Sequence, residues 1–257
     1  MIKIFVAGLL LACAFASSAF AGDIEVTSLL ETQGKADPAL LIGMERTEKL
    51  DSQILAFYVK LPDREILFDT GLRGGNITKR LAEAGVNPED VKTILLTHLH
   101  PDHFGGLVNS EGKAAFPNAE VYLGKVERDY WVDTLKNEKV IEALNLYKIN
   151  LFEFGDEVFD GVKALDASGH TPGHTVFDIT VGDEKLLIVG DIVHFIDVQL
   201  PAPDVSVKYD VDPDKARETR KAILDYAASS GAIIAGMHIT PPGVIKVRKT
   251  ATGYEKY

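Results

Sequence analysis

The sequence His98-Leu99-His100-Pro101-Asp102-His103 stands out in this chain of 257 residues, because it holds three of the seven histidines and a carboxylate within six positions. Thr93-Ile94-Leu95-Leu96-Thr97 comes immediately before it, and this apolar run is predicted to be a buried strand. Packing gives no reason to gather four polar titratable groups there, whereas neutral imidazole and carboxylate are ligands that zinc prefers. The two histidines at i, i+2 point to a shared side, and the next Asp-His pair is placed for a second ion.

Three further candidate ligands lie far apart in the sequence but in similar settings. His174 precedes a predicted strand, Asp191 ends one, and His238 follows one. Loops from several strand ends can converge on one site. Taken singly, each has a structural alternative, since Gly-Asp is common turn chemistry and a lone histidine can be a hydrogen-bonded core residue.

Strand and helix patterns alternate from residue 22 to residue 257, and no repeat, linker or charge block divides them, so we predict one domain. Strand-like runs cover residues 53–60, 65–68, 93–97, 177–181, 186–189 and 232–235. Helices are predicted from Asn76 to Gly85 and from Asp212 to Gly231, each with a capping residue at its start and a glycine at its end. This order predicts mixed sheets covered by helices, although the pattern does not give the strand order.

Residues 1–21 have the layout of a secretory signal peptide, with Lys3 near the start, an apolar run and an Ala-x-Ala pattern that ends at Ala21. We expect cleavage after Ala21 and a mature domain of residues 22–257 in the periplasm or the medium. Lipidation at Cys13, the one cysteine, is the alternative. No later run has the length of a membrane span.

The charge balance argues against nucleic acid as a partner. The chain has 27 Lys and Arg against 38 Asp and Glu, a formal net charge of −11, with 46% hydrophobic residues. Phosphate backbones require clustered cations. We therefore expect a small-molecule substrate, and the oligomeric state stays open.

The histidine cluster, together with the three later candidates, resembles the dinuclear metallo-β-lactamase-fold hydrolases. Asp69-Thr70-Gly71, after the strand at 65–68, matches an early turn of that family. The resemblance runs from about residue 50 to about residue 250, and its nearest subgroup is the acyl-homoserine lactonases and methyl parathion hydrolases. It implies an α+β fold, a four-layer αβ/βα sandwich, with two Zn²⁺ ions, although other divalent transition metals accept similar ligands.

The resemblance also assigns roles to residues. The first ion would be held by His98, His100 and His174. The second would be held by Asp102, His103 and His238, with Asp191 bridging both. A hydroxide shared by the two ions would attack the substrate, and Asp102 could accept a hydrogen bond from it.

Three more residues have open roles. His194 stands three residues after the bridging aspartate, where lactonases of the group often have a tyrosine, so it could donate a hydrogen bond or act as a general acid; the alternative is a histidine without a role. His170 is expected to stabilise its loop rather than bind metal. Asp69 either orients a ligand or forms the turn.

The sequence therefore predicts an exported metal-dependent hydrolase that cleaves a small ester-like bond, with a lactone such as an acyl-homoserine lactone as the first choice. An organophosphate or aryl ester is the alternative, but only Trp131 of the aromatic wall of such enzymes is visible. A non-catalytic zinc-binding protein is the alternative of another class. We expect the loops at 23–50 and 195–209 to shape the pocket.

Overall fold

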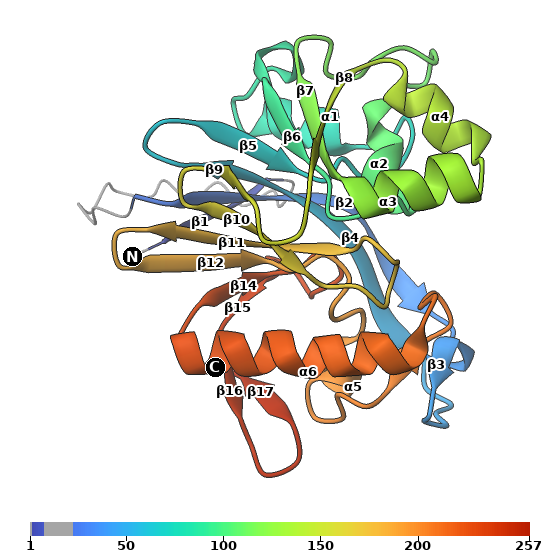
Figure 1. Ribbon diagram of the computed structural model, residues 1–257. Coiled ribbons are helices and arrows are strands. Elements are labelled where there is room, and N and C mark those ends of the chain that lie inside the picture. The colour runs from blue at the N-terminus through green and yellow to red at the C-terminus, as the bar shows by residue number, and fades with distance from the viewer. Residues whose placement is uncertain (1, 8–22) are drawn as a thin grey trace.

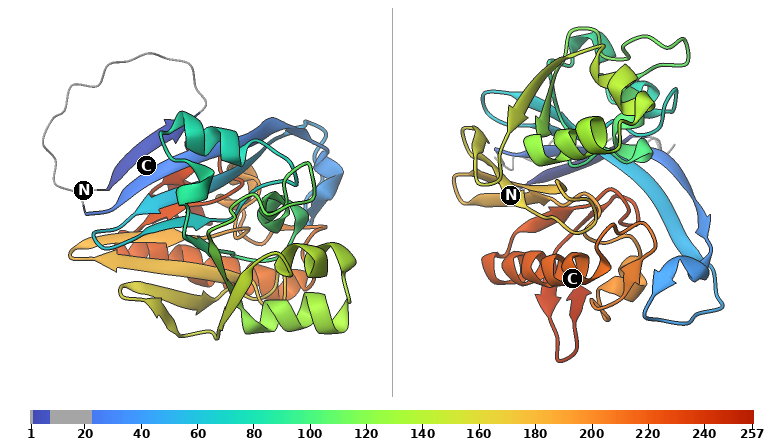
Figure 2. Two further views of the ribbon diagram at one scale, coloured as in Figure 1. Left: turned by 90° about the horizontal axis from the view of Figure 1, so that it is seen from above. Right: turned by 45° about the vertical axis from the view of Figure 1, so that its right-hand side comes forward.

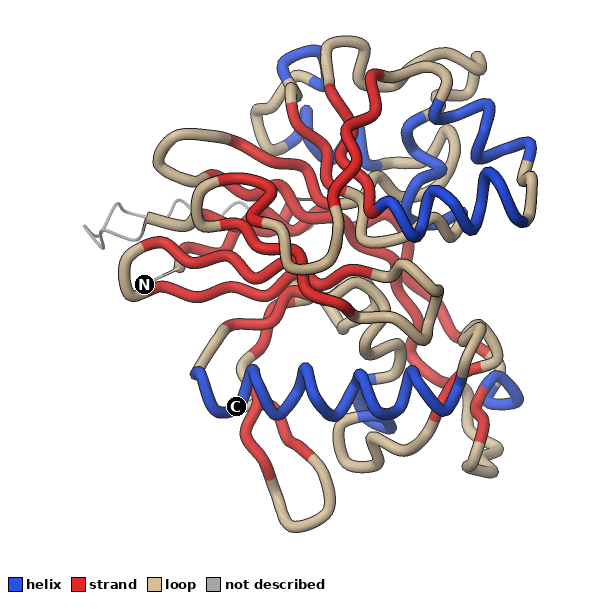
Figure 3. The backbone as a smooth tube through the Cα atoms, viewed as in Figure 1, coloured by secondary structure: helices blue, strands red, loops and turns tan. Residues whose placement is uncertain are grey.

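The structure is a computed structural model, and it describes residues 2–7 and 23–257. Two mixed sheets pack face to face, with helices on their outer sides (Figure 1). Figure 3 shows the strands in red between the blue helices. The predicted α+β sandwich of four layers is confirmed.

The first sheet has seven strands in the order β1-β2-β4-β5-β6-β7-β8. The strands are β1 Lys3–Ala7, β2 Glu25–Ala36, β4 Leu50–Lys60, β5 Glu65–Phe68, β6 Thr93–Leu95, β7 Glu120–Gly124 and β8 Lys148–Phe152. The β4–β5 hairpin is antiparallel, as predicted, and β5 to β8 run parallel to one another. The long strands β2 and β4 extend beyond the rest of the sheet towards β3 (Figure 2).

The second sheet has six strands in the order β15-β14-β12-β11-β10-β9. They are β9 Glu157–Phe159, β10 Val162–Asp166, β11 Thr175–Val181, β12 Glu184–Ile188, β14 Ile233–Ala235 and β15 Val244–Ile245. Two short antiparallel pairs lie outside the sheets: β3 Leu41–Ile42 with β13 Ser206–Val207, and β16 Val247–Lys249 with β17 Tyr254–Lys256.

The helices are mostly short. They are α1 Ile77–Glu83, α2 Pro101–Phe104, α3 Lys125–Arg128, α4 Glu138–Leu144, α5 Ile196–Gln199 and α6 Pro213–Ser230, with a π-helical turn at Asp129–Thr134. The longest helix, α6, begins and ends as predicted. The Asp212 side chain accepts a hydrogen bond from the Lys215 N–H, and Gly231 ends the helix with a φ of 68°.

Besides a small apolar cluster around β3 and β13, three apolar cores in the described part of the chain hold the layers together. Strand β4 contributes to two of them, because Leu55, Phe57 and Val59 face the second sheet while Ala56 and Tyr58 face the helices on the other side. This alternation follows from the two-residue period of a strand. A third core lies between the second sheet and α6. The sheets are therefore fixed on both faces, and the loops at their strand ends are carried on a rigid base.

The amino-terminal residues Lys3–Ala7 form β1, which pairs in parallel with β2 at the edge of the first sheet. The side chains of Ile4, Phe5 and Val6 are 41–50% exposed. Cys13 and the expected cleavage site at Ala21 lie outside the described residues. In the described part of the chain, no helix combines the length and the apolar character needed to cross a membrane.

Candidate metal centre

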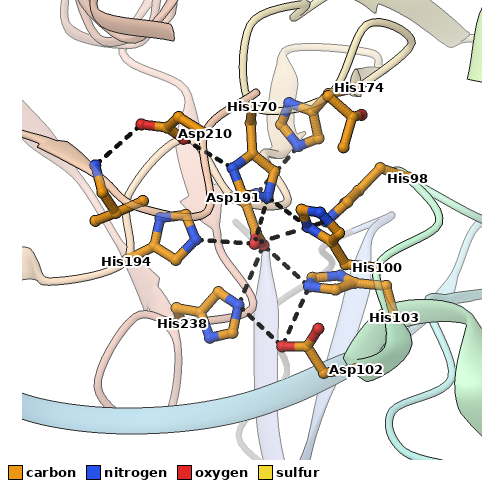
Figure 4. Close-up of polar contacts among 12 residues, drawn as sticks. His98, His100, Asp102, His103, His170, His174, Asp191, His194, Asp210 and His238 are labelled. Carbon is orange, nitrogen blue, oxygen red and sulfur yellow. Dashed lines mark hydrogen bonds and ion pairs between the residues drawn. The ribbon is translucent and has the colours of Figure 1, made fainter. Parts of the chain in front are cut away.

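The candidate ligands come from loops at the ends of strands in both sheets (Figure 4). His98 and His100 follow β6, and His103 lies on α2 directly after them. Asp191 follows β12, and His238 follows β14. The site therefore lies across the seam between the two sheets, and each sheet contributes ligands to it.

The first group contains His98, His100, His170 and Asp191. His100 Nδ1 lies 3.0 Å from His98 Nε2 and 2.9 Å from His170 Nε2. Asp191 Oδ2 lies 3.1 Å from His170 Nε2 and 3.7 Å from His98 Nε2. Atoms bound 2.0–2.1 Å from a tetrahedral zinc are roughly 3.3 Å from one another, so these spacings suit one ion.

The second group contains Asp102, His103 and His238, together with the other oxygen of Asp191. Asp191 Oδ1 lies 3.1 Å from His103 Nε2 and 3.2 Å from His238 Nε2. Asp102 Oδ2 lies 3.7 Å and 3.5 Å from the same two nitrogens. One oxygen of the buried Asp191 carboxylate thus faces each group, which is the geometry of a bridging ligand.

Hydrogen bonds on the far side of each ring determine which atoms face the centre. His103 Nδ1 lies 2.7 Å from Asp69 Oδ2, His170 Nδ1 lies 2.8 Å from Asp210 Oδ1, and His238 Nδ1 lies 2.7 Å from the Gln53 carbonyl.

Each acceptor draws the imidazole proton to Nδ1, so the Nε2 lone pair of the neutral ring faces the group. His103 Nε2 and Asp191 Oδ1 are buried and have no hydrogen-bond partner among the described residues. When these rings are neutral, their Nε2 lone pairs and the carboxylate oxygens converge, and such an arrangement fits a bound cation.

The buried carboxylates of the site also favour positive charge on the groups between them. Burial opposes a charge on His170, but the Asp191 and Asp210 carboxylates outweigh it and raise the pKa of His170 to about 9. Burial likewise opposes a charge on His103, yet Asp191, Asp102 and Asp69 raise its pKa well above the ordinary value. The carboxylates that favour protons on these rings would equally favour a divalent cation between them.

The prediction that His174 belongs to the first group of ligands and that His170 only stabilises its loop is wrong. The structure places each of the two residues where the other was expected. His174 Nδ1 lies 3.1 Å from the Ala167 carbonyl, and its Nε2 accepts the Asp191 N–H at 3.1 Å, so backbone groups use both ring nitrogens. A Cβ added at Gly190 would lie 2.4 Å from His174 Nε2, so this ring packs directly under the Gly190-Asp191 turn. His170 instead joins the first group.

Asp69 orients a ligand and also shapes its turn. Its carboxylate accepts hydrogen bonds from the Thr97 N–H and hydroxyl, both at 2.8 Å, in addition to its contact with His103. Its φ of 57° lies in the left-handed region, which aspartate tolerates better than most residues. Both readings of Asp69 left open by the sequence therefore fit its geometry.

Sequence reasoning missed two buried acidic residues near the site, Asp210 and Glu127. Asp210 follows β13, forty residues after the His170 ring that it contacts. Its other oxygen accepts the Val207 N–H and lies 3.8 Å from the buried guanidinium of Arg220. Neither acidic residue stands in a recognisable motif, since each reaches the site only through the tertiary fold.

A pocket of about 390 Å³ opens above the two groups. The metal-group residues at its base are His100, Asp102, Asp191 and His238, with His194 beside them. The other lining residues are mostly apolar: Ala36, Leu40, Ser52, Ile54, Leu72, Pro101, Phe195 and Tyr209. Both segments that the sequence treats as pocket loops contribute lining residues, but residues 25–36 of the first form strand β2 and not a loop. The second segment supplies the aromatic residues Phe195 and Tyr209, which the sequence had not suggested.

His194 forms a third candidate metal-binding group with Asp191 and His238, and Trp131 lies beside His100. His194 Nε2 is 3.0 Å from Asp191 Oδ2, and its ring stacks on that of His238 with centroids 5.0 Å apart. The Trp131 ring meets the edge of His100 with centroids 5.5 Å apart. It also packs against the core beneath the helices, so Trp131 links that core to the site.

The sequence profile of the Metallo-beta-lactamase superfamily matches residues 51–238. Two solved structures are similar over nearly the whole chain. A hydrolase in the beta-lactamase superfamily, AbOPH, is 30% identical with a TM-score of 0.84, and the dizinc quorum-quenching lactonase AidC, solved with a product N-hexanoyl-L-homoserine, is 27% identical with a TM-score of 0.83. Each match covers 93% of this chain and 95% of the other.

Curated relatives match over shorter stretches. An N-acyl homoserine lactonase of Bacillus sp is 39% identical over 102 residues, which are 38% of this chain and 36% of that protein. Eight of the curated relatives match over between 27% and 66% of their own length.

Proposed function

We propose that this chain, which belongs to the metallo-beta-lactamase superfamily and is a metal-dependent hydrolase, opens lactones such as acyl-homoserine lactones. One observation carries the proposal. The Asp191 carboxylate joins two groups of ligands at the base of a largely apolar pocket. A reactive centre beneath apolar walls suits a small ester ring that carries an acyl chain.

Two divalent ions, zinc in the first instance, fit the ligands present. Those of the first would be His98, His100, His170 and Asp191 Oδ2, and those of the second would be Asp102, His103, His238 and Asp191 Oδ1. Bound there, the ions would supply Lewis-acid activation of water and of the substrate oxygen. Imidazole and carboxylate are also ligands for other divalent transition metals.

The residues around the ions would position the reactants. Asp102 is partly exposed to the pocket, so its carboxylate can accept a hydrogen bond from the attacking water. His194 Nδ1 is buried and has no hydrogen-bond partner in the described part of the chain, whereas Nε2 lies 3.0 Å from the Asp191 carboxylate, so the ring proton lies on Nε2. That N–H faces Asp191 Oδ2, and with this oxygen bound to a metal it could donate instead to the carbonyl or to the leaving oxygen of a lactone.

The His194 role is tested by replacing it with Ala. We expect kcat to fall by roughly 10²-fold or more, the range for a positioned proton donor, while both metals stay bound. Unchanged turnover would leave His194 as a packing residue.

The substrate is tested by proton release in a pH-stat from the metal-loaded protein. Long-chain acyl-homoserine lactones should turn over faster than a methyl phosphotriester or an aryl ester. The phosphotriester is a genuine competitor, since Phe195 and Tyr209 provide aromatic walls. Faster turnover of the phosphotriester or aryl ester would replace the lactone proposal, and two bound metals without turnover would favour a metal-binding protein.

We further propose that the protein is exported to the periplasm or the medium after cleavage at Ala21. Support comes from the residue pattern of positions 1–21. The test is the intact mass of the protein recovered from the periplasm and the medium of an expressing bacterium. A mass corresponding to residues 22–257 supports export, whereas a full-length cytoplasmic product contradicts it.

A further inference from the structure

Glu127 is a buried acidic residue that the proposed chemistry does not use. It lies on α3, which follows β7 directly, and its side chain is fully buried. Burying a carboxylate is costly unless its oxygens are well hydrogen-bonded. A buried position of this kind is ordinarily apolar, so the hydrogen bonds of Glu127 should explain why a carboxylate is stable there.

The Glu127 carboxylate accepts four hydrogen bonds from three separate segments. Its Oε1 accepts the Leu99 N–H at 2.9 Å and the Trp131 indole N–H at 2.7 Å. Its Oε2 accepts the Thr171 hydroxyl at 2.7 Å and the Gly173 N–H at 2.9 Å. All four partners are neutral donors, and every one is a full hydrogen bond by distance.

Two of these segments carry the three histidines of the first metal group. Leu99 lies between His98 and His100, and Thr171 directly follows His170. The His170 loop also packs tightly here, since a Cβ added at Gly173 would lie 2.1 Å from the Glu127 backbone nitrogen.

We propose that Glu127 is a positioning residue for the first metal group: its carboxylate holds the loop of His98 and His100 against the loop of His170. The four hydrogen bonds of Glu127 form a junction between the two loops, and the distance of 2.9 Å between His100 Nδ1 and His170 Nε2 depends on it. The inference rests on the two-metal site of the proposed function and is independent of the substrate. The second group, held by Asp69 and Gln53 on its far side, does not use this junction.

The conservative variant Glu127→Gln tests how far the first metal group depends on the Glu127 carboxylate. Glutamine has the same shape, but its NH₂ group would face backbone or indole N–H groups that can only donate. At least one of the four bonds would be lost and two donors would repel each other. Glu120→Gln is the matched control, because Glu120 is a partly exposed carboxylate of β7 that pairs with Lys148, away from both loops.

The experiment titrates Zn²⁺ and Co²⁺ into the metal-free protein and measures stoichiometry and affinity. We expect the wild type and Glu120→Gln to bind two ions, and Glu127→Gln to bind one ion normally and the other about ten-fold or more weakly. The emission of Trp131, the one tryptophan of the chain, should change in metal-free Glu127→Gln, because its indole N–H loses a charged acceptor.

Two-ion binding by the wild type tests the proposed site, and the difference between the wild type and Glu127→Gln tests Glu127. Wild-type affinity at both sites in Glu127→Gln, with or without a lower melting temperature, would overturn the inference. Should Glu127→Gln fail to fold, Thr171→Val decides, because it removes one of the four bonds without leaving a repelling donor. Selective weakening of one ion in Thr171→Val supports positioning, and unchanged binding of both contradicts it.

Discussion

His170 and His174 occupy equivalent-looking places in Gly169-His170-Thr171-Pro172-Gly173-His174, yet only one faces the metal groups. The difference arises from partners on the far side of each ring. Asp210 directs His170 Nε2 to the site, whereas the Asp191 N–H occupies His174 Nε2. Sequence spacing carries no information about either partner, so the choice between the two histidines could not be made from the motif.

Replacing each histidine with Ala should separate their roles. His170→Ala should lose one bound metal and more than about 100-fold of activity, since it removes a ligand. His174→Ala should keep a two-metal stoichiometry but lose about 1–3 kcal/mol of stability, because it breaks two buried hydrogen bonds. Metal analysis and thermal unfolding distinguish them. Loss of metal from His174→Ala with none from His170→Ala would reverse the assignment.

Helix α6 acts on the site through one buried cation, Arg220. Its Nε donates to the Ile192 carbonyl at 2.7 Å, and its Nη1 donates to the carbonyls of Pro203 and Val205, both at 2.9 Å. These three hydrogen bonds therefore hold the segment that carries His194 and Phe195 against α6.

We expect Arg220→Met to cost about 3 kcal/mol or more, because buried carbonyls and Asp210 lose a charged partner. The KM should rise more than kcat falls, since the loop forms the pocket wall rather than the metal groups. Arg217→Met is the matched control on α6, because Arg217 is partly exposed and pairs with the exposed Asp214, and it should change stability by no more than about 0.5 kcal/mol. Equal losses in the two variants would show that Arg220 has no special role.

Strand β2 has a bulge at Glu31 that aims a carboxylate at the loop after β5. Pairing with β4 skips from Leu30 to Thr32, and the Glu31 carboxylate accepts the Asn76 N–H at 2.7 Å. Burial raises the pKa of Glu31 above its ordinary value, although backbone hydrogen bonds and Arg80 oppose the shift.

A raised pKa means that the folded protein holds this proton more tightly than the unfolded chain. The stabilisation is therefore present below pH 4.5, the ordinary pKa, and is lost as the pH rises through the folded value. The free energy of unfolding of the wild type minus that of Glu31→Gln should fall between pH 4 and pH 7, as measured by urea unfolding of the metal-free proteins. A difference that is constant or rises with pH would contradict this.

At the scale of the whole molecule, the fold could be predicted because its strands carry apolar residues on both faces and its longest helix has a capping residue at each end. The β4–β5 hairpin, α6 and the buried strand before His98 all follow from such local patterns. The cluster at 98–103 was also visible, since its residues are adjacent in sequence. Glu127, Asp210 and Arg220 were not, because each reaches its partners only through the tertiary fold.

The sandwich explains how distant residues share one centre. Ligands from the first sheet and from the second meet at the seam, and Asp191 contacts both groups. A metal bound there would link the two halves, so removing it with a chelator should lower the melting temperature as well as the activity.

The most direct test adds Zn²⁺ stepwise to the metal-free protein and follows acyl-homoserine lactone hydrolysis at each step. Two groups bridged by Asp191 predict activity that rises up to two equivalents of metal and then stays constant, and Asp191→Asn should abolish that rise. Full activity at one equivalent, or two tightly bound ions without lactone hydrolysis, would contradict the account.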